Sequence, residues 1–257
     1  MSDGAAETAR RNYIFVCGAP RSGTTAITQL LNFHPNIVIG IERYKNVKRA
    51  DLCEQLFTAE RFFDFRQSDT NVLFPGTYLK LREKYRDATW IGDKWPRYYT
   101  RYEELFEKFE DCVVIFMLRD VHAVASSWNK RAENPADRWP ESNDYTRAVE
   151  EWNLSLKRTL EFKRKYKNRL LIVEYEQLFS GDIVIFKRIL HRLNLAMPKP
   201  LLRRFRGITR NWDERSRKPL AQREGQTDFV NAHADMQSCA KLRRLALRGK
   251  ARETVGV

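Results

Sequence analysis

Residues 13–25 read YIFVCGAPRSGTT and join a short apolar run to a helical pattern through a loop with two glycines. The first five of these residues (YIFVC) have the β-branched and aromatic character of a buried parallel strand, which Gly18 ends. From Thr24 to residue 33, apolar side chains recur at helical spacing. A strand, a glycine-containing loop and a helix in this order are typical of an anion-binding site at the carboxyl edge of a parallel sheet.

The loop GAPRSGTT has the glycine spacing of the phosphate-binding pattern G-x-x-x-x-G-K-[ST], with one departure. Thr24 stands where that pattern has lysine, and the cation of the loop is Arg21 instead. Because the lysine of an ATP-dependent enzyme contacts the β- and γ-phosphates, its absence argues against Mg·ATP. The helix dipole and a set of backbone N–H groups are expected to solvate an anion. These N–H groups belong to Ser22, Gly23, Thr24 and Thr25.

The rest of the chain alternates apolar strand patterns with helical patterns. This alternation predicts a three-layer, P-loop-like α/β fold with a central, mostly parallel sheet flanked by helices. Val113–Leu118 (VVIFML) gives the strongest strand signal. Further strands are predicted at residues 37–39, 90–93 and 170–173. Helices are predicted at residues 24–33, 51–66, 101–110, 121–131, 145–167, 183–195 and 239–247.

The domain organisation follows from the ends of this pattern. Residues 1–11 are interpreted as a flexible tail, and residues 12–257 as a single domain. After Pro198 the chain becomes basic and irregular, and this C-terminal part, about residues 199–257, is expected to be mainly helical.

Composition limits the class of protein. The 257 residues include 47 basic and 33 acidic side chains, which gives a net charge of +14. No apolar run approaches the roughly 20 residues of a membrane-spanning helix, and residues 1–11 lack the apolar stretch of a secretory signal. Four scattered cysteines and four histidines form no zinc-binding spacing. We therefore expect a protein without a metal, in a reducing compartment such as the cytoplasm.

GAPRSGTT resembles the 5′-phosphosulfate loop of the sulfotransferases that use 3′-phosphoadenosine 5′-phosphosulfate (PAPS), most closely in the protein-tyrosine and carbohydrate branches. The second motif of that family binds the 3′-phosphate through an Arg at a strand end and a Ser eight positions later, which here are Arg119 and Ser127. Tyr175, in LLIVEYEQL, matches a family tyrosine that helps to hold the nucleotide. The resemblance covers roughly residues 13–195 and implies PAPS as donor and PAP as product.

The resemblance also implies three catalytic residues. Arg21 and Lys94, the latter in Gly-Asp-Lys-Trp-Pro, would stabilise the leaving 5′-phosphate and the sulfuryl oxygens. Glu42 matches the catalytic Glu that follows a His-Pro element, here at His34, and would act as general base. Arg43 departs from the small residue expected after this Glu. Its charge would either weaken Glu42 as a base or bind an acidic acceptor.

Other candidates rank lower. His34 is expected to be structural, and His122 is expected nearer the 3′-phosphate than the sulfate. An aromatic cluster either lines an acceptor pocket or belongs to the core. It consists of Tyr98, Tyr99 and Tyr102. A basic segment is either a loop that closes over the nucleotide or a solvated tail. Its candidates are Arg215, Arg217, Lys218 and Arg223.

The sequence features suggest three different functions for this protein. The first is a PAPS-dependent sulfotransferase acting on a hydroxyl of a glycan, glycolipid or small metabolite, or on tyrosine. The alternative is a P-loop nucleotide or small-molecule kinase that uses ATP. Charge alone suggests a nucleic-acid binder, but no recognition motif supports it and no specific nucleic acid is expected. The basic C-terminal part would steer an anionic donor, contact an acidic acceptor or lie against anionic lipid headgroups. The sequence does not predict an oligomeric state.

Overall fold

The computed structural model describes residues 11–72, 74–216 and 224–247, with the backbone alone for residues 211–216. Five strands form one sheet in the order β2-β3-β1-β4-β5, and each neighbouring pair is parallel. The strands are β1 (Asn12–Cys17), β2 (Ile37–Ile41), β3 (Trp90–Lys94), β4 (Val113–Leu118) and β5 (Leu170–Glu174). Residues 1–10 of the predicted tail lie outside the described residues, as do Arg217, Lys218, Arg223 and the side chain of Arg215.

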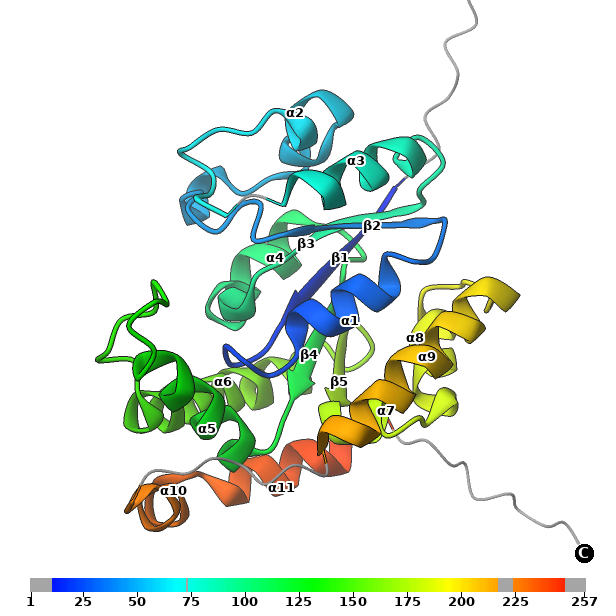
Figure 1. Ribbon diagram of the computed structural model, residues 1–257. Coiled ribbons are helices and arrows are strands. Elements are labelled where there is room, and N and C mark those ends of the chain that lie inside the picture. The colour runs from blue at the N-terminus through cyan, green and yellow to red at the C-terminus, as the bar shows by residue number, and fades with distance from the viewer. Residues whose placement is uncertain (1–10, 73, 217–223, 248–257) are drawn as a thin grey trace, which may run out of the picture.

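Helices alternate with the strands along the chain, as Figure 1 shows. Three short 3-10 helices are η1 (Arg49–Asp51), η2 (Glu54–Phe57) and η3 (Pro96–Arg101). The α-helices of the first half are α1 (Thr24–Leu31), α2 (Ala59–Phe63), α3 (Pro75–Lys84), α4 (Tyr102–Lys108) and α5 (Val121–Ala132). Those of the second half are α6 (Tyr145–Lys165), α7 (Tyr175–Phe179), α8 (Ile183–Arg192), α9 (Lys199–Ser216), α10 (Gln226–His233) and α11 (Met236–Leu245).

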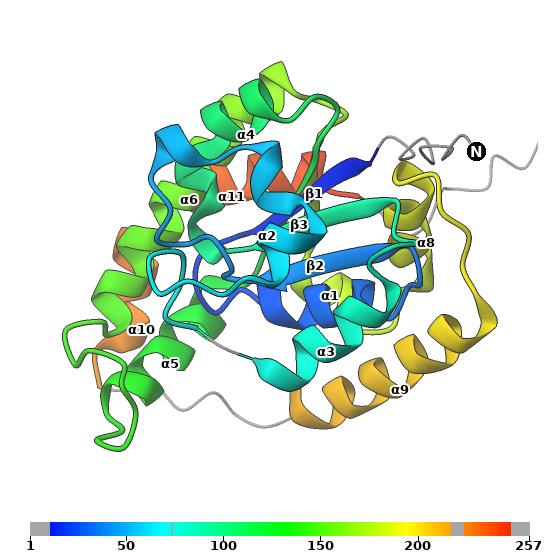
Figure 2. The same ribbon diagram turned by 90° about the horizontal axis from the view of Figure 1, so that it is seen from above.

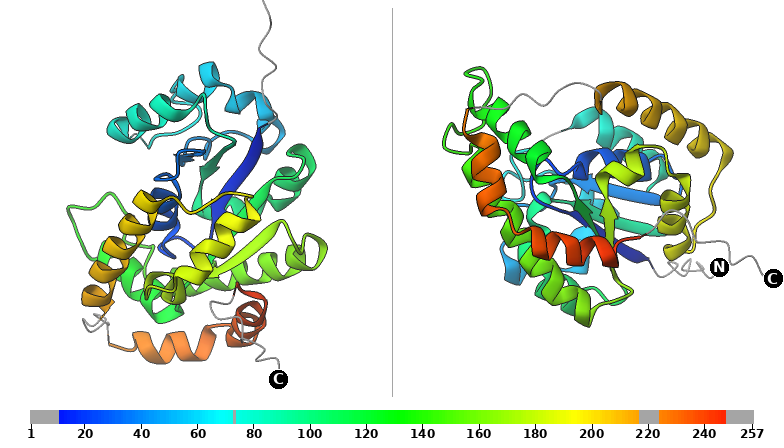
Figure 3. Two further views of the ribbon diagram at one scale, coloured as in Figure 1. Left: turned by 90° about the vertical axis from the view of Figure 1, so that its right-hand side faces the viewer. Right: turned by 90° about the horizontal axis from the view of Figure 1, so that it is seen from below.

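The sheet is buried between two layers of helices, which Figures 2 and 3 show from three sides. Successive side chains of a strand point to opposite faces, so β1 contributes to two cores. Phe15 and Cys17 belong to a cluster with α4, α5 and α6, whereas Ile14 and Val16 belong to a cluster with α1, α8 and α9. The predicted three-layer α/β fold with a central parallel sheet is confirmed.

The predicted helix at residues 51–66 is wrong, because η1, η2 and α2 occupy this segment instead. Only Leu52, Phe57 and Phe62 are buried, five positions apart, whereas Ala59 is exposed, and the backbone is interrupted twice. The Thr58 side chain accepts from the N–H of Arg61 and so starts α2 anew. The guanidinium of Arg43 then binds the carbonyl oxygens of Phe62 and Asp64, where α2 ends.

Three further helices differ from expectation. The sequence analysis missed α3 and α10, whose buried residues are few: Tyr78 and Leu81 in α3, and Gln226 and Val230 in α10. The segment after Pro198, expected to begin irregularly, is the continuous helix α9. Its buried residues Leu201, Phe205 and Thr209 recur every four positions, which is the period of a helix side packed on a core.

The strand register aligns the carboxyl ends of the strands along one edge of the sheet. Lys94 of β3 is paired in register with Val16 of β1 and with Ile41 of β2. On the other side, Leu118 of β4 is paired with Glu174 of β5. The residues that follow the five strands therefore lie along one edge. No helix among the described residues is both long and apolar enough to span a membrane.

Candidate active site

The loop between β1 and α1 is fixed by backbone hydrogen bonds and by contacts at Gly23. The N–H of Gly18 donates to the carbonyl oxygen of Pro96 at 3.0 Å, and Trp128 Nε1 donates to that of Pro20 at 2.9 Å. Gly23 has φ of 85°, and a Cβ there would lie 2.3 Å from the ring of Tyr175. The close approach of this ring and the left-handed backbone both require glycine.

The N-terminus of α1 is open towards this loop. Gly23 is the N-cap residue and has no side chain to accept from the N–H groups of the first turn, which contains no acidic residue. Ser22 Oγ is buried and has no hydrogen-bond partner among the described residues. Thr24 and Thr25 begin the helix. The N–H of Ser22 donates to the carbonyl oxygen of Ala19 at 2.9 Å. The N–H groups of the first helical turn have no partner within the helix, and with the buried Ser22 hydroxyl they fit an anion that accepts hydrogen bonds from the loop.

Four predicted nucleotide-binding residues meet beside the loop. Arg119, which follows β4, donates from Nη1 to the carbonyl oxygen of Arg21 at 2.7 Å, and its guanidinium lies 4.4 Å from the ring centre of Tyr175. Arg119 Nε is buried without a hydrogen-bond partner among the described residues. Arg21 Nε donates to Ser127 Oγ at 2.9 Å. The backbone of Arg21 has φ of 76°, a left-handed conformation that is uncommon for a residue with a side chain.

A third guanidinium adds to this positive region. Burial, together with the charges of Arg131 and Arg119, lowers the pKa of Arg21. Arg131 lies one turn after Ser127 on α5 and pairs with Asp137 through two hydrogen bonds of 2.6 and 2.7 Å. The sequence analysis missed Arg131, for which the spacing from Ser127 was the available signal. Clustered guanidinium groups favour a phosphate-bearing ligand.

Glu42 and Lys94 form an ion pair on the other side of β1. Lys94 Nζ lies 3.0 Å from Glu42 Oε1, and Lys45 Nζ lies 3.7 Å from Glu42 Oε2. The Lys94 side chain is 2% exposed, whereas that of Glu42 is 23% exposed. The N–H of Glu42 donates to the carbonyl oxygen of Lys94 at 2.6 Å. A partly accessible carboxylate is thus held on a buried ammonium group.

Asp93, which the sequence analysis missed, fixes the backbone that carries Glu42. Its Oδ1 accepts from the N–H of Arg43 at 2.9 Å. Its Oδ2 accepts from the N–H of Tyr44 at 3.2 Å and from the hydroxyl of Tyr98 at 2.8 Å. The two N–H groups belong to the residues directly after Glu42, which itself has a left-handed φ of 54°. Burial raises the pKa of Asp93 to about 6. In the sequence, only the position of Asp93, a charged residue within an otherwise apolar strand pattern, indicated that it has a special role.

Neither role expected for Arg43 agrees with its contacts. The residue is fully buried, and its guanidinium donates to Asp69 Oδ2 at 2.8 Å and to the carbonyl oxygen of Phe62 at 3.0 Å. A guanidinium paired with Asp69 in the core is not available to an acidic acceptor, and its charge is already compensated. Arg43 instead ties the loop after β2 to α2.

The lower-ranked candidates belong mainly to the core. His34 is buried, with Nδ1 accepting from the N–H of Asn36 and Nε2 3.0 Å from the carbonyl oxygen of Ala196, as a structural residue requires. Burial also lowers its pKa. His122 Nδ1 is buried without a hydrogen-bond partner among the described residues. The aromatic cluster is fully buried, which places it in the core rather than along a pocket. Its members are Tyr98, Tyr99 and Tyr102.

The predicted site residues therefore form two groups. One comprises Glu42 and Lys94, and the other comprises Arg21, Arg119, Ser127 and Tyr175 with the loop. Among the described residues, no hydrogen bond or ion pair joins Arg21 to Glu42 or Lys94. No group of three or more His, Cys, Asp or Glu side chains in the described ranges is placed to hold a metal ion.

A parallel sheet with an open anion loop, two guanidinium groups and a carboxylate–ammonium pair at one edge defines an α/β enzyme of group transfer. Comparison with protein families matches residues 13–199 to the sulfotransferase family, and the chain belongs to that family. It is therefore a sulfotransferase, and the family implies PAPS as donor. This membership also decides against the ATP-dependent kinase that the sequence left as an alternative.

Solved structures show the same fold at low identity. The sulfotransferase domain of the Synechococcus PCC 7002 olefin synthase is 20% identical, with a TM-score of 0.50 over 75% of this chain and 76% of that chain. The sulfotransferase domain of the curacin biosynthetic pathway is also 20% identical, with a TM-score of 0.52 over 75% and 77%. Mouse sulfotransferase SULT7A1, in complex with PAP, is 14% identical, with a TM-score of 0.50 over 92% and 83%. The search of curated proteins found no match.

Proposed function

We propose that this protein transfers the sulfuryl group of PAPS to a hydroxyl group by in-line displacement, with Glu42 as general base. The observation that carries the proposal is the ion pair between Glu42 and Lys94, 3.0 Å long, at the edge of the sheet that also carries the anion loop. A base and a cation close together meet two requirements of this reaction, namely proton removal and stabilisation of a developing negative charge.

The residues of the loop side would hold the donor, which supplies an activated sulfuryl group when bound. The backbone N–H groups of Gly23, Thr24 and Thr25, together with the Ser22 hydroxyl, are suited to the 5′-phosphosulfate. Arg119 and Ser127 are suited to the 3′-phosphate, and the ring of Tyr175 stands against the loop. The fit is supported by two buried groups without partners among the described residues, Ser22 Oγ and Arg119 Nε, because buried donors seek acceptor oxygens.

The Glu42–Lys94 side would carry out the proton transfer. Glu42 is paired with Lys94 and is partly open to solvent, so an acceptor hydroxyl can reach it. When Glu42 takes the hydroxyl proton, its negative charge is lost and the Lys94 ammonium loses its ionic partner. That positive charge then becomes available to oxygens on which negative charge develops. Proton removal and charge stabilisation are thereby coupled through one ion pair.

Arg21 is the third proposed catalytic residue, although its observed hydrogen bond is to Ser127. Its guanidinium lies between the loop and α5, so we assign it to charge stabilisation at the donor.

The acceptor is proposed to be a hydroxyl of a glycan, glycolipid or small metabolite, with tyrosine as a further candidate. All four cysteines are free, as expected for the reducing environment of the cytoplasm.

Donor binding is tested by thermal unfolding with PAP and, separately, with Mg·ATP. We expect PAP to raise the melting temperature and Mg·ATP to leave it unchanged, because a ligand that binds only the folded state stabilises it. A shift with Mg·ATP alone would contradict the proposal. Incubation with labelled PAPS and a panel of glycan, lipid and tyrosine acceptors then identifies the acceptor class.

A further inference from the structure

Helix α9 carries a stripe of positive charge that the proposed reaction does not use. Four exposed cations, Lys199, Arg203, Arg206 and Arg210, recur every three or four residues. They fall within roughly 60° of one another around the helix. Residues 199–210 contain no acidic side chain, and none of the four cations forms an ion pair with a described residue. Like charges at this spacing repel one another, so the fold itself gains nothing from the stripe.

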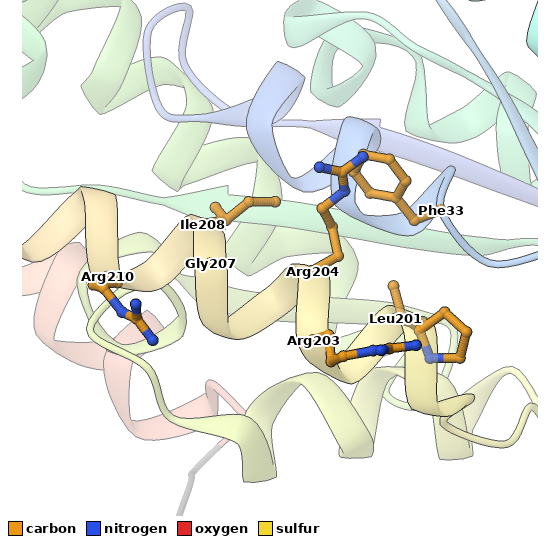
Figure 4. Close-up of a pocket in the computed structure, with 8 residues that line it drawn as sticks. Phe33, Leu201, Arg203, Arg204, Gly207, Ile208 and Arg210 are labelled. Carbon is orange, nitrogen blue, oxygen red and sulfur yellow. The ribbon is translucent and has the colours of Figure 1, made fainter.

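A hollow of about 680 Å³ lies beside this stripe and combines charge with apolar surface. It is lined by α9 and by Phe33, which follows α1 and is 44% exposed. Figure 4 shows Arg204 over the ring of Phe33, at 4.3 Å from the ring centre. Gly207 opens the middle of the hollow, since a Cβ there would have no neighbour within 4 Å. We call Phe33, Arg204 and the four cations the α9 face.

The same side of the molecule has a second, more apolar hollow on α3. Figure 1 shows α1 between α3 and α9, and Figure 2 shows α3 and α9 on the same side of the sheet. The second hollow measures about 390 Å³ and is lined by Phe65, Phe74 and Leu79, of which Leu79 is 66% exposed. These three and Phe33 are four of the seven large apolar side chains exposed in the described residues. Lys80 and Arg82 flank them, and Glu83 is the one exposed acid of α3.

We propose that the α9 face, together with the apolar hollow of α3, docks on a bilayer that contains anionic lipids. The cations match the phosphates of the headgroups, and the exposed Phe and Leu side chains match the interface between headgroups and acyl chains. A soluble polyanion would engage the cations but would leave the apolar side chains in water. Charge complementarity combined with apolar exposure therefore favours a bilayer. The proposal does not depend on sulfuryl transfer.

Sedimentation with vesicles tests this surface. One set consists of phosphatidylcholine, and the other of phosphatidylcholine and phosphatidylglycerol in equal amounts, at physiological ionic strength. We expect the full chain to bind the anionic vesicles alone. The triple variant Arg203→Glu, Arg206→Glu, Arg210→Glu should weaken binding by about tenfold or more. Phe33→Ser should weaken it by about fivefold, because its apolar burial at the interface is lost.

Matched variants on the other face of the sheet control for net charge and for apolar exposure. Lys157→Glu, Arg164→Glu and Lys167→Glu change the same number of charges on and just after α6, which packs in the opposite core cluster from α9. Leu154, at 46% exposed, gives the control Leu154→Ser for Phe33. Both control variants should bind anionic vesicles as the unchanged chain does. Stabilisation by PAP should persist in every variant, which separates this proposal from the proposed function.

Four outcomes would overturn the proposal. One is that the unchanged chain does not bind anionic vesicles. Another is equal weakening by the α6 triple variant, which would show an effect of net charge. A third is release by millimolar inorganic phosphate, which would show a discrete phosphate pocket. The last is binding of heparin through the same arginines while Phe33→Ser leaves vesicle binding unchanged, which would show a polyanion site.

Discussion

The two groups of site residues differ in how their charges are compensated. At the ends of β2 and β3, the buried Lys94 is paired with Glu42. At the ends of β1 and β4, Arg21 and Arg119 bind a hydroxyl and a carbonyl oxygen, and neither forms an ion pair with a described residue. A carboxylate that takes up a proton releases the positive charge of its partner to a developing anion, whereas uncompensated guanidinium groups favour an anionic ligand from the start. In the proposed reaction, proton transfer and donor binding would therefore occupy separate parts of one sheet edge.

The largest expected effect comes from Glu42→Gln, which removes the proposed base and keeps its size. We expect kcat to fall by about 10³-fold, because general-base catalysis contributes roughly 10²–10⁴-fold. The KM for PAPS and the thermal stabilisation by PAP should change little, since the loop side is untouched. Steady-state kinetics and thermal unfolding measure both. A kcat within tenfold of the unchanged chain would remove Glu42 from the role of base.

Lys94→Met provides the control for the ion pair. If Glu42 and Lys94 act as a unit, each single variant should lose a similar amount of kcat, and the double variant should lose little more. Multiplying effects in the double variant would show that the two residues act independently.

The second prediction concerns the other group. Arg119→Ala should raise the KM for PAPS by about 10- to 100-fold, the value of a charge-assisted hydrogen bond, with a smaller change in kcat. Arg147→Ala, at an exposed pair with Glu150 on α6, is a control that should change neither constant. An unchanged KM for PAPS in the Arg119 variant would contradict its assignment to the donor.

A third prediction tests the packing of Tyr175 against the loop. In Gly23→Ala the new Cβ would meet the ring at 2.3 Å, so the ring must move and donor affinity should fall by about tenfold. Adding Tyr175→Ala removes the clash but leaves φ at 85°, a conformation that costs alanine roughly 1 kcal/mol. The double variant should therefore regain part of the PAP-dependent shift in melting temperature. Tyr175→Ala alone measures what the ring contributes to donor binding. If that single variant keeps the PAP-dependent shift and the double variant regains none of it, backbone strain governs the loop.

The sheet edge was predictable from the sequence because it depends on local order. A polar residue directly after a buried parallel strand lies at the carboxyl edge, and this rule places Glu42 and Arg119 there from the sequence alone. Arg43 was misinterpreted because neighbours in sequence suggested exposure, whereas its partner is Asp69 on a later segment. Asp93 was missed for the same reason, since its role depends on N–H groups about fifty residues earlier.

The same distinction explains the wrong helix at residues 51–66. Its apolar spacing was helical, but the helix end is set by carbonyl oxygens that bind Arg43, a residue outside the segment. The buried residues Leu52, Phe57 and Phe62 recur every five positions, so the helical period did not match the burial, and periodicity does not record which backbone groups a distant side chain binds. Long-range polar contacts to the backbone are therefore what the sequence analysis lacked.

The smallest expected effect on turnover comes from Asp93→Asn. An amide accepts hydrogen bonds through one oxygen only, so the N–H of Arg43 or that of Tyr44 loses its acceptor and the backbone after Glu42 loosens. We expect kcat to fall by up to about tenfold while the KM for PAPS is retained. A raised KM with unchanged kcat would place Asp93 with the donor-binding group and would weaken the separation of the two groups.

The pH dependence of stability gives Asp93 a readout that a general loss of packing would not move. Its pKa is about 6 in the folded protein, above the roughly 3.9 of an unfolded Asp, so the folded state holds the proton more tightly. The stability that this group contributes is present below about pH 4 and is lost as the pH rises through 6. Relative to Asp93→Asn, the unchanged chain should therefore lose free energy of unfolding between these values, on the order of 3 kcal/mol, and then stay level. Urea unfolding across this range measures the difference, and a constant difference at all pH values would show that Asp93 does not titrate as a buried acid.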